Sequence, residues 1–147
     1  MATQVEHIKW VPGARFMVDG FRFQNSRCCH YFLTHSHGDH TTGLNKSFNA
    51  GTIYCTPITA KLLVEESGIP EHMIQSVNLD EPFELEGCQI TAICANHCPG
   101  ACMFLFRLHR PASKARMSGA TSILHTGDFR YDAHPPWSEF LQGCLFG

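Results

Sequence analysis

The sequence of 147 residues is long enough for one domain with a hydrophobic core. Hydrophobic residues at 44% and charged residues at 16% are typical of a globular protein and exclude a disordered tail. The formal net charge of −2 excludes a uniformly basic nucleic-acid-binding domain, although a metal site or a local basic patch still attracts phosphate.

Neither a membrane segment nor a disulfide framework is expected. No apolar run approaches the roughly 18 residues that a membrane-spanning helix needs. Residues 1–10 lack the apolar core of a secretory signal, so we expect a nuclear or cytosolic protein with eight reduced cysteines. Cys94, Cys98 and Cys102 recur every four residues around His97. Because no C-x-x-C pair occurs, we interpret these cysteines as structural rather than as a thiolate metal site.

Short extended runs separated by turn residues dominate the chain. Residues 16–19 and 21–23 flank Gly20 and predict an opening hairpin. The apolar and aromatic run 29–34 predicts a buried strand, which ends at a polar, glycine-containing stretch. Residues 52–55 predict another short strand.

One helix has clear start and stop signals. Thr56 is the candidate N-cap, Pro57 suits the first helical position, and Gly68 suits the C-terminal cap. Three apolar residues can share one face of this helix, namely Ala60, Leu63 and Val64, with Lys61 and Glu65 outside that face. Five later runs predict strands, at residues 74–79, 83–85, 88–95, 101–108 and 121–125. The segment 107–120, rich in basic and turn residues, is predicted to be a solvated hairpin loop.

Three histidines and an aspartate lie within residues 35–40, directly after the predicted buried strand. His35 and His37 are two residues apart, so a helix would separate them by about 200°. A turn that leaves a strand points both side chains the same way, toward one metal ion. Asp39 and His40 diverge from that pair and can reach a second ion. Imidazole and carboxylate ligands suit Zn²⁺, with Mn²⁺ or Fe²⁺ as alternatives, and favour a metal site over a histidine-rich surface turn.

Two later stretches carry the residue types that complete such a site. His97 follows the apolar run 88–95 and Asp128 follows the run 121–125, so each lies at the end of a predicted strand. Loops at strand ends are held by a rigid sheet and often assemble metal sites. We therefore predict that four side chains converge on one ion: His35, His37, His97 and Asp128. His125 lies within an apolar run and is expected to be structural.

These motifs resemble the DNA cross-link repair nucleases, the group that includes Artemis and Apollo, in the β-CASP branch of the metallo-β-lactamase fold. The pattern H-x-H-x-D-H over residues 35–40 specifies only the superfamily. Three stretches are much more specific to the repair nucleases: 31–40, 95–101 and 123–130. Residues 18–21 resemble the opening strand of that family. The similarity extends from about Pro12 to Asp132, which is nearly the whole chain.

The resemblance implies an α/β fold, the αββα sandwich of the family. Residues 1–147 would form its amino-terminal half, a partial metallo-β-lactamase domain with the β-CASP region absent. It implies six metal-site residues, namely His35, His37, Asp39, His40, His97 and Asp128. The three histidines at 35, 37 and 97 would hold the first ion, Asp128 would bridge, and the other two would face a second ion. Asp39 and Asp128 are the candidate catalytic residues, with one or two Zn²⁺ ions as cofactors.

The resemblance further implies metal-dependent hydrolysis of DNA phosphodiesters in interstrand cross-link and double-strand-break repair. Relatives typically act as 5′-to-3′ exonucleases on 5′-phosphorylated ends, so DNA is the expected partner and the nucleus the expected location. No nucleophilic side chain is required, and neither a G-x-S-x-G elbow nor a P-loop occurs. Two alternatives stay open: a non-catalytic truncated product, and a small-ester or thioester hydrolase of the same superfamily.

Overall fold

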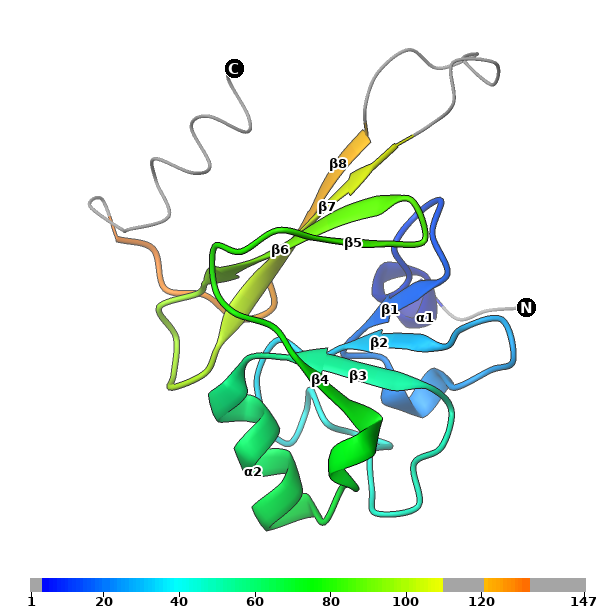
Figure 1. Cartoon of the computed structure of the whole chain (residues 1–147), viewed down its shortest axis with the longest axis vertical. Helices are drawn as coiled ribbons and strands as arrows, with labels where there is room; N and C mark the ends of the chain where they lie inside the picture. The colour runs from blue at the N-terminus through cyan, green and yellow to red at the C-terminus, as the bar shows by residue number, and fades with distance from the viewer. Residues whose placement is uncertain (1–3, 110–120, 133–147) are drawn as a thin grey trace.

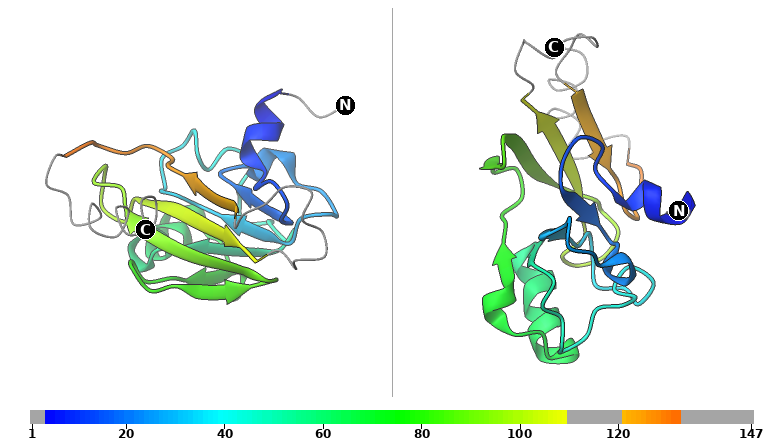
Figure 2. Two further views of the ribbon diagram at one scale, coloured as in Figure 1. Left: turned by 90° about the horizontal axis from the view of Figure 1, so that it is seen from above. Right: turned by 90° about the vertical axis from the view of Figure 1, so that its right-hand side faces the viewer.

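Two four-stranded sheets form the framework of this computed structural model, which describes residues 4–109 and 121–132. The first sheet is parallel, in the order β1 (Phe16–Val18), β2 (His30–Phe32), β3 (Thr52–Cys55) and β4 (Ile74–Ser76). The second is antiparallel, in the order β5 (Phe83–Leu85), β6 (Cys88–Cys94), β7 (Cys102–Leu108) and β8 (Thr121–His125). The described helices are α1 (Gln4–Lys9), α2 (Pro57–Ser67) and the short 3₁₀ helices η1 (Phe21–Phe23) and η2 (Glu71–Met73). Figures 1 and 2 show how the two sheets lie beside each other.

The strands of the first sheet are short apolar runs because both of its faces are covered. On one face of β2, Phe32 packs against Phe104 and Phe106 of β7, with ring centroids 5.2 and 5.1 Å apart. On the opposite face, Tyr31 belongs to the buried cluster that includes Leu63 of α2. Neighbouring side chains on a strand point to opposite faces, so one core lies between the sheets and another lies under the helix.

The predicted opening hairpin of residues 16–19 and 21–23 is wrong. β1 pairs in parallel with β2, and the second segment forms the 3₁₀ helix η1. All three residues of β1 are buried, which is the pattern of a parallel sheet covered on both faces. Phe21 is also fully buried and stacks on Tyr31 with ring centroids 5.7 Å apart. Residues 21–23 therefore form a 3₁₀ helix that buries the Phe21 ring under the first sheet, instead of the second strand of a hairpin.

Helix α2 begins and ends at the predicted residues. Pro57 takes the first helical position after Thr56, and Gly68 adopts the left-handed conformation at the C-terminal cap, with φ of 65°. The Thr56 hydroxyl does not cap the helix; it donates to the carbonyl oxygen of Gly100, 2.6 Å away in the loop between β6 and β7. Of the three apolar residues expected to share one face, Ala60 and Leu63 are buried, whereas Val64 is 38% exposed. The buried surface of α2 is therefore narrower than the predicted apolar face and leaves out Val64.

The later strands lie close to their predicted positions. β4 ends at Ser76 rather than at residue 79, because the chain there crosses to the second sheet, where Asp80 N donates to Ala92 O over 2.8 Å. β7 continues to Leu108, and β8 pairs with it antiparallel. Most of the predicted loop 107–120 falls outside the described residues. None of the described helices has the length and apolarity needed to span a membrane.

Candidate metal centre

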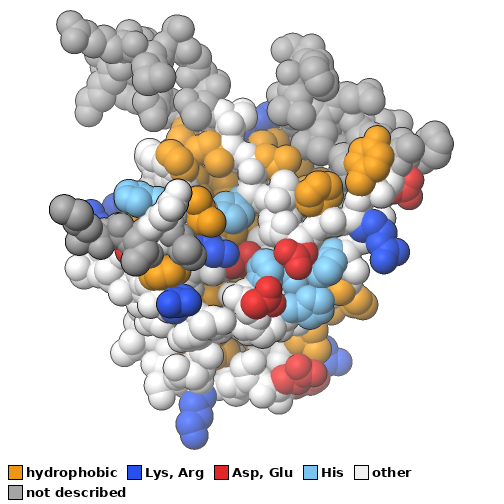
Figure 3. Space-filling model, turned by 180° about the vertical axis from the view of Figure 1, so that it is seen from behind, with side chains coloured by type: hydrophobic (Ala, Val, Ile, Leu, Met, Phe, Trp, Pro, Cys, Tyr) orange, Lys and Arg blue, Asp and Glu red, His pale blue; other side chains and the backbone are white. Residues whose placement is uncertain are grey.

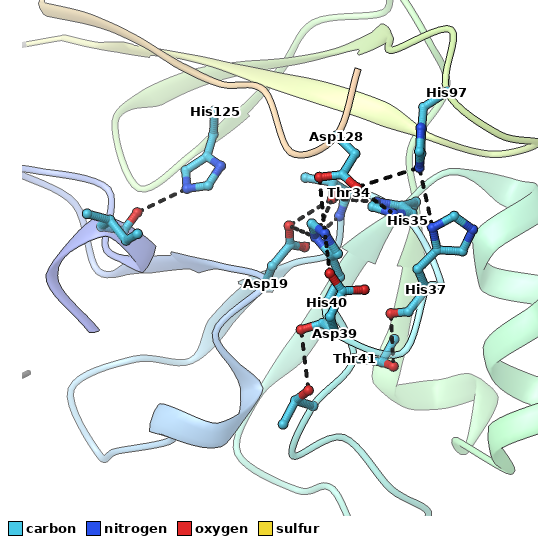
Figure 4. A network of polar contacts seen from close by, with 12 residues as sticks. Asp19, Thr34, His35, His37, Asp39, His40, Thr41, His97, His125 and Asp128 are labelled. Atoms are coloured by element: carbon cyan, nitrogen blue, oxygen red, sulfur yellow. Dashed lines mark hydrogen bonds and ion pairs between the residues drawn. The ribbon is translucent and has the colours of Figure 1, made fainter. Parts of the chain in front are cut away.

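Four segments that are far apart in the sequence meet where the two sheets adjoin (Figure 4). Residues 33–40 continue from β2, His97 lies in the loop between β6 and β7, and Asp128 follows β8. The fourth segment is the end of β1, which is followed by Asp19. Because the segments come from both sheets, the packing of one sheet on the other brings these side chains together.

Three imidazole rings and one carboxylate face a common point. His35 Nε2 lies 3.0 Å from His37 Nδ1, which in turn lies 3.3 Å from His97 Nε2. The Oδ2 atom of Asp128 lies 4.0 Å from His35 Nε2 and 3.7 Å from His97 Nε2. One ligand atom from each of these four residues lies within 4.8 Å of the others. The structure thus brings together the four residues predicted to share an ion.

The donor types and their spacing fit a tetrahedral zinc ion. Zinc–nitrogen bonds of about 2.0–2.1 Å at tetrahedral angles place ligand atoms about 3.3 Å apart. The two histidine pairs, at 3.0 and 3.3 Å, lie at or slightly below that spacing, and Asp128 Oδ2 lies slightly beyond it, at 3.7 and 4.0 Å. The side chain of His35 is fully buried, whereas those of His97 and Asp128 are 28% and 48% exposed. The centre is therefore anchored in the core and open to solvent on one face, where Figure 3 shows histidine and acidic side chains together.

Asp128 also faces a second group of donors. While its Oδ2 faces the three histidines, its Oδ1 lies 3.4 Å from His40 Nε2. The same nitrogen of His40 lies 3.5 Å from Oδ2 of Asp39, whose side chain is 79% exposed. Asp128 therefore occupies a bridging position, with Asp39 and His40 on its other side.

Asp19 was not among the predicted site residues, yet it holds the second group in place. Its Oδ2 accepts a hydrogen bond from His40 Nδ1 over 2.8 Å and one from the Thr34 hydroxyl over 2.8 Å. Its Oδ1 accepts from the backbone N–H of Thr34 over 2.9 Å, and the residue is only 5% exposed. With the Nδ1 proton of His40 directed at Asp19, the Nε2 lone pair is directed at Asp39 and Asp128. A carboxylate directly after a fully apolar strand is the sequence signal that could have indicated this role.

The pKa values of the two buried histidines, His35 and His40, are shifted in opposite directions. Burial, aided by the nearby His40 and His37 rings, lowers the pKa of His35 to about 4. The ring of His35 is therefore uncharged at neutral pH and keeps a lone pair for a metal ion. The hydrogen bond to Asp19 raises the pKa of His40 above its ordinary value, against the effect of burial.

Close backbone contacts fix the loop of Asp128 against the loop of the histidines. Gly127 has φ of 51°, and a Cβ atom there would lie 2.6 Å from the hydroxyl oxygen of Thr34. Thr34 O in turn accepts a hydrogen bond from the backbone N–H of Cys102 over 2.9 Å. Arg130 N donates to Ala95 O over 2.9 Å, next to the loop of His97. Only glycine permits this close approach, so the geometry of the centre depends on residue 127 as well as on the ligands.

The other histidine and cysteine candidates lie outside the centre. His125 donates from Nε2 to the carbonyl oxygen of Ile8 over 3.1 Å, which is the structural role expected for it. Within the described residues, Cys94, Cys98 and Cys102 belong to no group of three metal-ligating side chains. Cys102 is fully buried, and burial raises the pKa of its thiol well above the ordinary value. The seven described cysteines are free thiols.

Comparison with protein families and solved structures supports the fold. The model of the beta-lactamase superfamily domain matches residues 26–144. The crystal structure of the metallo-beta-lactamase SMB-1 bound to 2-mercaptoethanesulfonate superposes with a TM-score of 0.55 at 15% identity. That superposition covers 78% of this chain and 54% of that structure. The metallo-β-lactamase fold predicted from the motifs is therefore confirmed. At 15% identity, the similarity to this crystal structure supports the fold but not a function.

Curated relatives align over most of this chain. DNA ligase 6 of Arabidopsis thaliana is 36% identical over 142 residues, which covers 96% of this chain and 10% of the relative. DNA cross-link repair protein SNM1 of the same plant is 42% identical over 123 residues, covering 83% and 24%. The 5′ exonuclease Apollo of Gallus gallus is 34% identical over 123 residues, covering 82% and 24%. The chain thus spans between 10% and 24% of the length of these relatives.

Proposed function

Since the chain belongs to the beta-lactamase superfamily, we propose that it is a metal-dependent hydrolase that cleaves DNA phosphodiesters during DNA repair. The convergence of three histidines and Asp128 supports metal-dependent hydrolysis and is the observation on which the proposal depends. DNA as the substrate is supported by relatives that are named DNA cross-link repair proteins and a 5′ exonuclease. We further propose that the substrate end carries a 5′-phosphate and that the protein acts in the nucleus.

We propose Zn²⁺ as the resident metal, in one or two copies. Six residues are proposed to hold it, namely His35, His37, Asp39, His40, His97 and Asp128. Uncharged imidazole and carboxylate are donors that zinc prefers, and the fully buried ring of His35 fixes the inner side of the site. When bound, Zn²⁺ supplies a Lewis acid that makes water nucleophilic near neutral pH and stabilises negative charge on a phosphoryl group.

The protein's own groups have separate roles in this proposal. Asp39 is largely exposed at the solvent side of the site and is placed to accept a proton from the attacking water. Asp19 orients His40, so that His40 Nε2 stays directed at Asp39 and Asp128. The Thr34 hydroxyl is buried and donates to Asp19, so it does not serve as a nucleophile. The attacking group is therefore proposed to be water.

The test is cleavage of three substrates by the zinc-treated chain: 5′-phosphorylated single-stranded DNA, the same DNA with a 5′-hydroxyl, and a generic thioester. We expect the phosphorylated DNA to be cleaved fastest, with activity lost on chelation and restored by Zn²⁺. His97→Ala should abolish cleavage, whereas the matched variant His72→Ala, at an exposed histidine of η2, should retain it. Faster hydrolysis of the thioester would refute the DNA assignment and favour a small-ester hydrolase. Metal binding without turnover of any substrate would favour the non-catalytic alternative.

Metal identity and location need separate measurements. Mass spectrometry of the chain purified without added metal should find zinc, and manganese or iron in its place would refute the zinc assignment. A fluorescent fusion of the complete gene product should accumulate in the nucleus if the protein acts in DNA repair. Exclusion of that fusion from the nucleus would refute the proposed location.

A further inference from the structure

A second group of metal-ligating side chains lies away from the centre described above. Cys29 and His30 stand where β2 begins, and Glu86 lies in the turn between β5 and β6. One ligand atom from each of these three residues lies within 4.8 Å of the others. His30 precedes His35 by five residues, about 16 Å along an extended chain. The group therefore lies near the opposite end of β2 from the first centre and joins the first sheet to the second.

The ring of His30 is already oriented for a ligand. Its Nδ1 is 3.1 Å from the Tyr54 hydroxyl, and its Nε2 is 3.4 Å from Oε1 of Glu86. Phe16 contacts the ring edge-on at a centroid distance of 5.5 Å, and Tyr54 lies at 5.7 Å. A hydrogen bond donated by Nδ1 to the Tyr54 hydroxyl oxygen would leave the lone pair of Nε2 for a metal. His30 is thus held with Nε2 directed at Glu86.

The backbone of Cys29 is fixed although its side chain is exposed. Cys29 O accepts a hydrogen bond from Thr52 N over 2.9 Å. The chain at Gly51 passes so closely that a Cβ atom there would lie 2.2 Å from this oxygen. An exposed thiol on a fixed backbone is accessible to ions from solution and loses little conformational freedom when it binds one.

Glu86 occupies an unusual position for a glutamate. It and Gly87 are the two central residues of the β5–β6 turn, with φ of 47° and 74°. Such turns favour Asn-Gly, because both central residues need positive φ. Arg15 donates to both carboxylate oxygens, over 2.6 and 3.3 Å, and so holds the carboxylate in place. An ionised carboxylate has about four acceptor positions, so lone pairs remain for a further partner.

We propose that Cys29, His30 and Glu86 form a second zinc site, separate from the histidine and aspartate centre. The donors are one sulfur, one imidazole nitrogen and one carboxylate oxygen, a set that zinc accepts in tetrahedral geometry with water in the fourth position. Two of the three residues are exposed, so the ion exchanges with solution. A bound ion links the amino end of β2 to the β5–β6 turn and thereby clamps the two sheets.

Cobalt titration of the chain tests this proposal, because a thiolate ligand to Co²⁺ gives an intense charge-transfer absorption in the near ultraviolet. The first centre contains no sulfur donor among the described residues, so this band distinguishes the second site from the first. We expect the band in the chain and in the control variant Cys98→Ser, whose thiol adjoins the loop of the first centre. Cys29→Ser should abolish the band. Absence of the band in the unchanged chain, or its persistence in Cys29→Ser, would overturn the proposal.

A second variant separates loss of the ligand from damage to the fold. Glu86→Asn removes the carboxylate but creates the Asn-Gly sequence that this turn favours, so the hairpin should persist. We expect Co²⁺ affinity at the second site to fall at least about tenfold, while far-ultraviolet circular dichroism stays unchanged. In the double variant His35→Ala/His37→Ala the charge-transfer band should remain, because neither residue belongs to the second site. Unchanged affinity in Glu86→Asn would show that Glu86 only pairs with Arg15.

Discussion

Replacement of Asp19 by asparagine should weaken metal binding without unfolding the protein. The amide oxygen of asparagine can still accept the hydrogen bond from Thr34 N, now 2.9 Å from Oδ1. The amide NH₂ group, however, would donate to His40 Nδ1, which at present donates to Oδ2 over 2.8 Å. His40 would then carry its proton on Nε2, the nitrogen that lies 3.4 Å from Asp128 Oδ1. The lone pair directed at the second ion would be lost.

Loss of this kind of supporting hydrogen bond typically costs about 10–100-fold in metal affinity. At 25 °C that range corresponds to about 1.4–2.8 kcal/mol of binding free energy. Asp19→Ala should have a different effect, because it leaves the buried N–H of Thr34 without its partner and leaves His40 Nδ1 only the 3.4 Å contact with the Thr34 hydroxyl. An orphaned buried group costs roughly 1–3 kcal/mol of folding free energy. Asparagine is therefore the more informative replacement.

The assay is Zn²⁺ affinity by competition with a chelator, together with thermal unfolding and ¹⁵N chemical shifts of the histidine rings. The exposed variant Asp80→Asn is the matched control, since it makes the same change on a turn far from the centre in sequence. Asp19→Asn should bind the second ion more weakly and show the changed tautomer of His40, whereas the control should do neither. Unchanged affinity with the original tautomer of His40 would refute the positioning role of Asp19.

His37→Ala should remove most hydrolytic activity, because a metal ligand is lost. The circular dichroism spectrum should stay near that of the unchanged chain, because the apolar strands remain. Activity that survives this change would show that the attacking water is activated elsewhere. In the metal-free chain, ring NMR should show His35 titrating near pH 4 and His40 above 6.5. Since His35 binds its proton more weakly in the folded state, its contribution to stability should fall as pH drops from 6.5 toward 4. Titration of the denatured, unreduced chain should find nearly all eight thiols free. Among the described cysteines of the native chain, the exposed Cys29 should react first and the buried Cys55 and Cys102 last, because burial raises the thiol pKa of Cys55 to about 12 and that of Cys102 well above its ordinary value.

The features that depend on neighbouring residues could be predicted from the sequence alone. The limits of α2 follow from Pro57 and Gly68, whose backbone preferences act within a single turn of chain. The pairing of His35 with His37 likewise follows from the two-residue repeat of extended chain, which needs no information from elsewhere. Helix caps and strand periodicity are properties of neighbouring residues, so they can be predicted without knowledge of the fold.

Contacts between distant segments were decided only by the tertiary structure. Parallel pairing of β1 with β2 depends on burial of both faces of the strand, which the sequence of residues 16–23 does not reveal. The hydrogen bond from His40 to Asp19 joins residues 21 apart, and the group at Cys29 includes Glu86, 57 positions later. These distances depend on how the two sheets pack, and that packing is set by the combined burial of many apolar side chains rather than by any one motif.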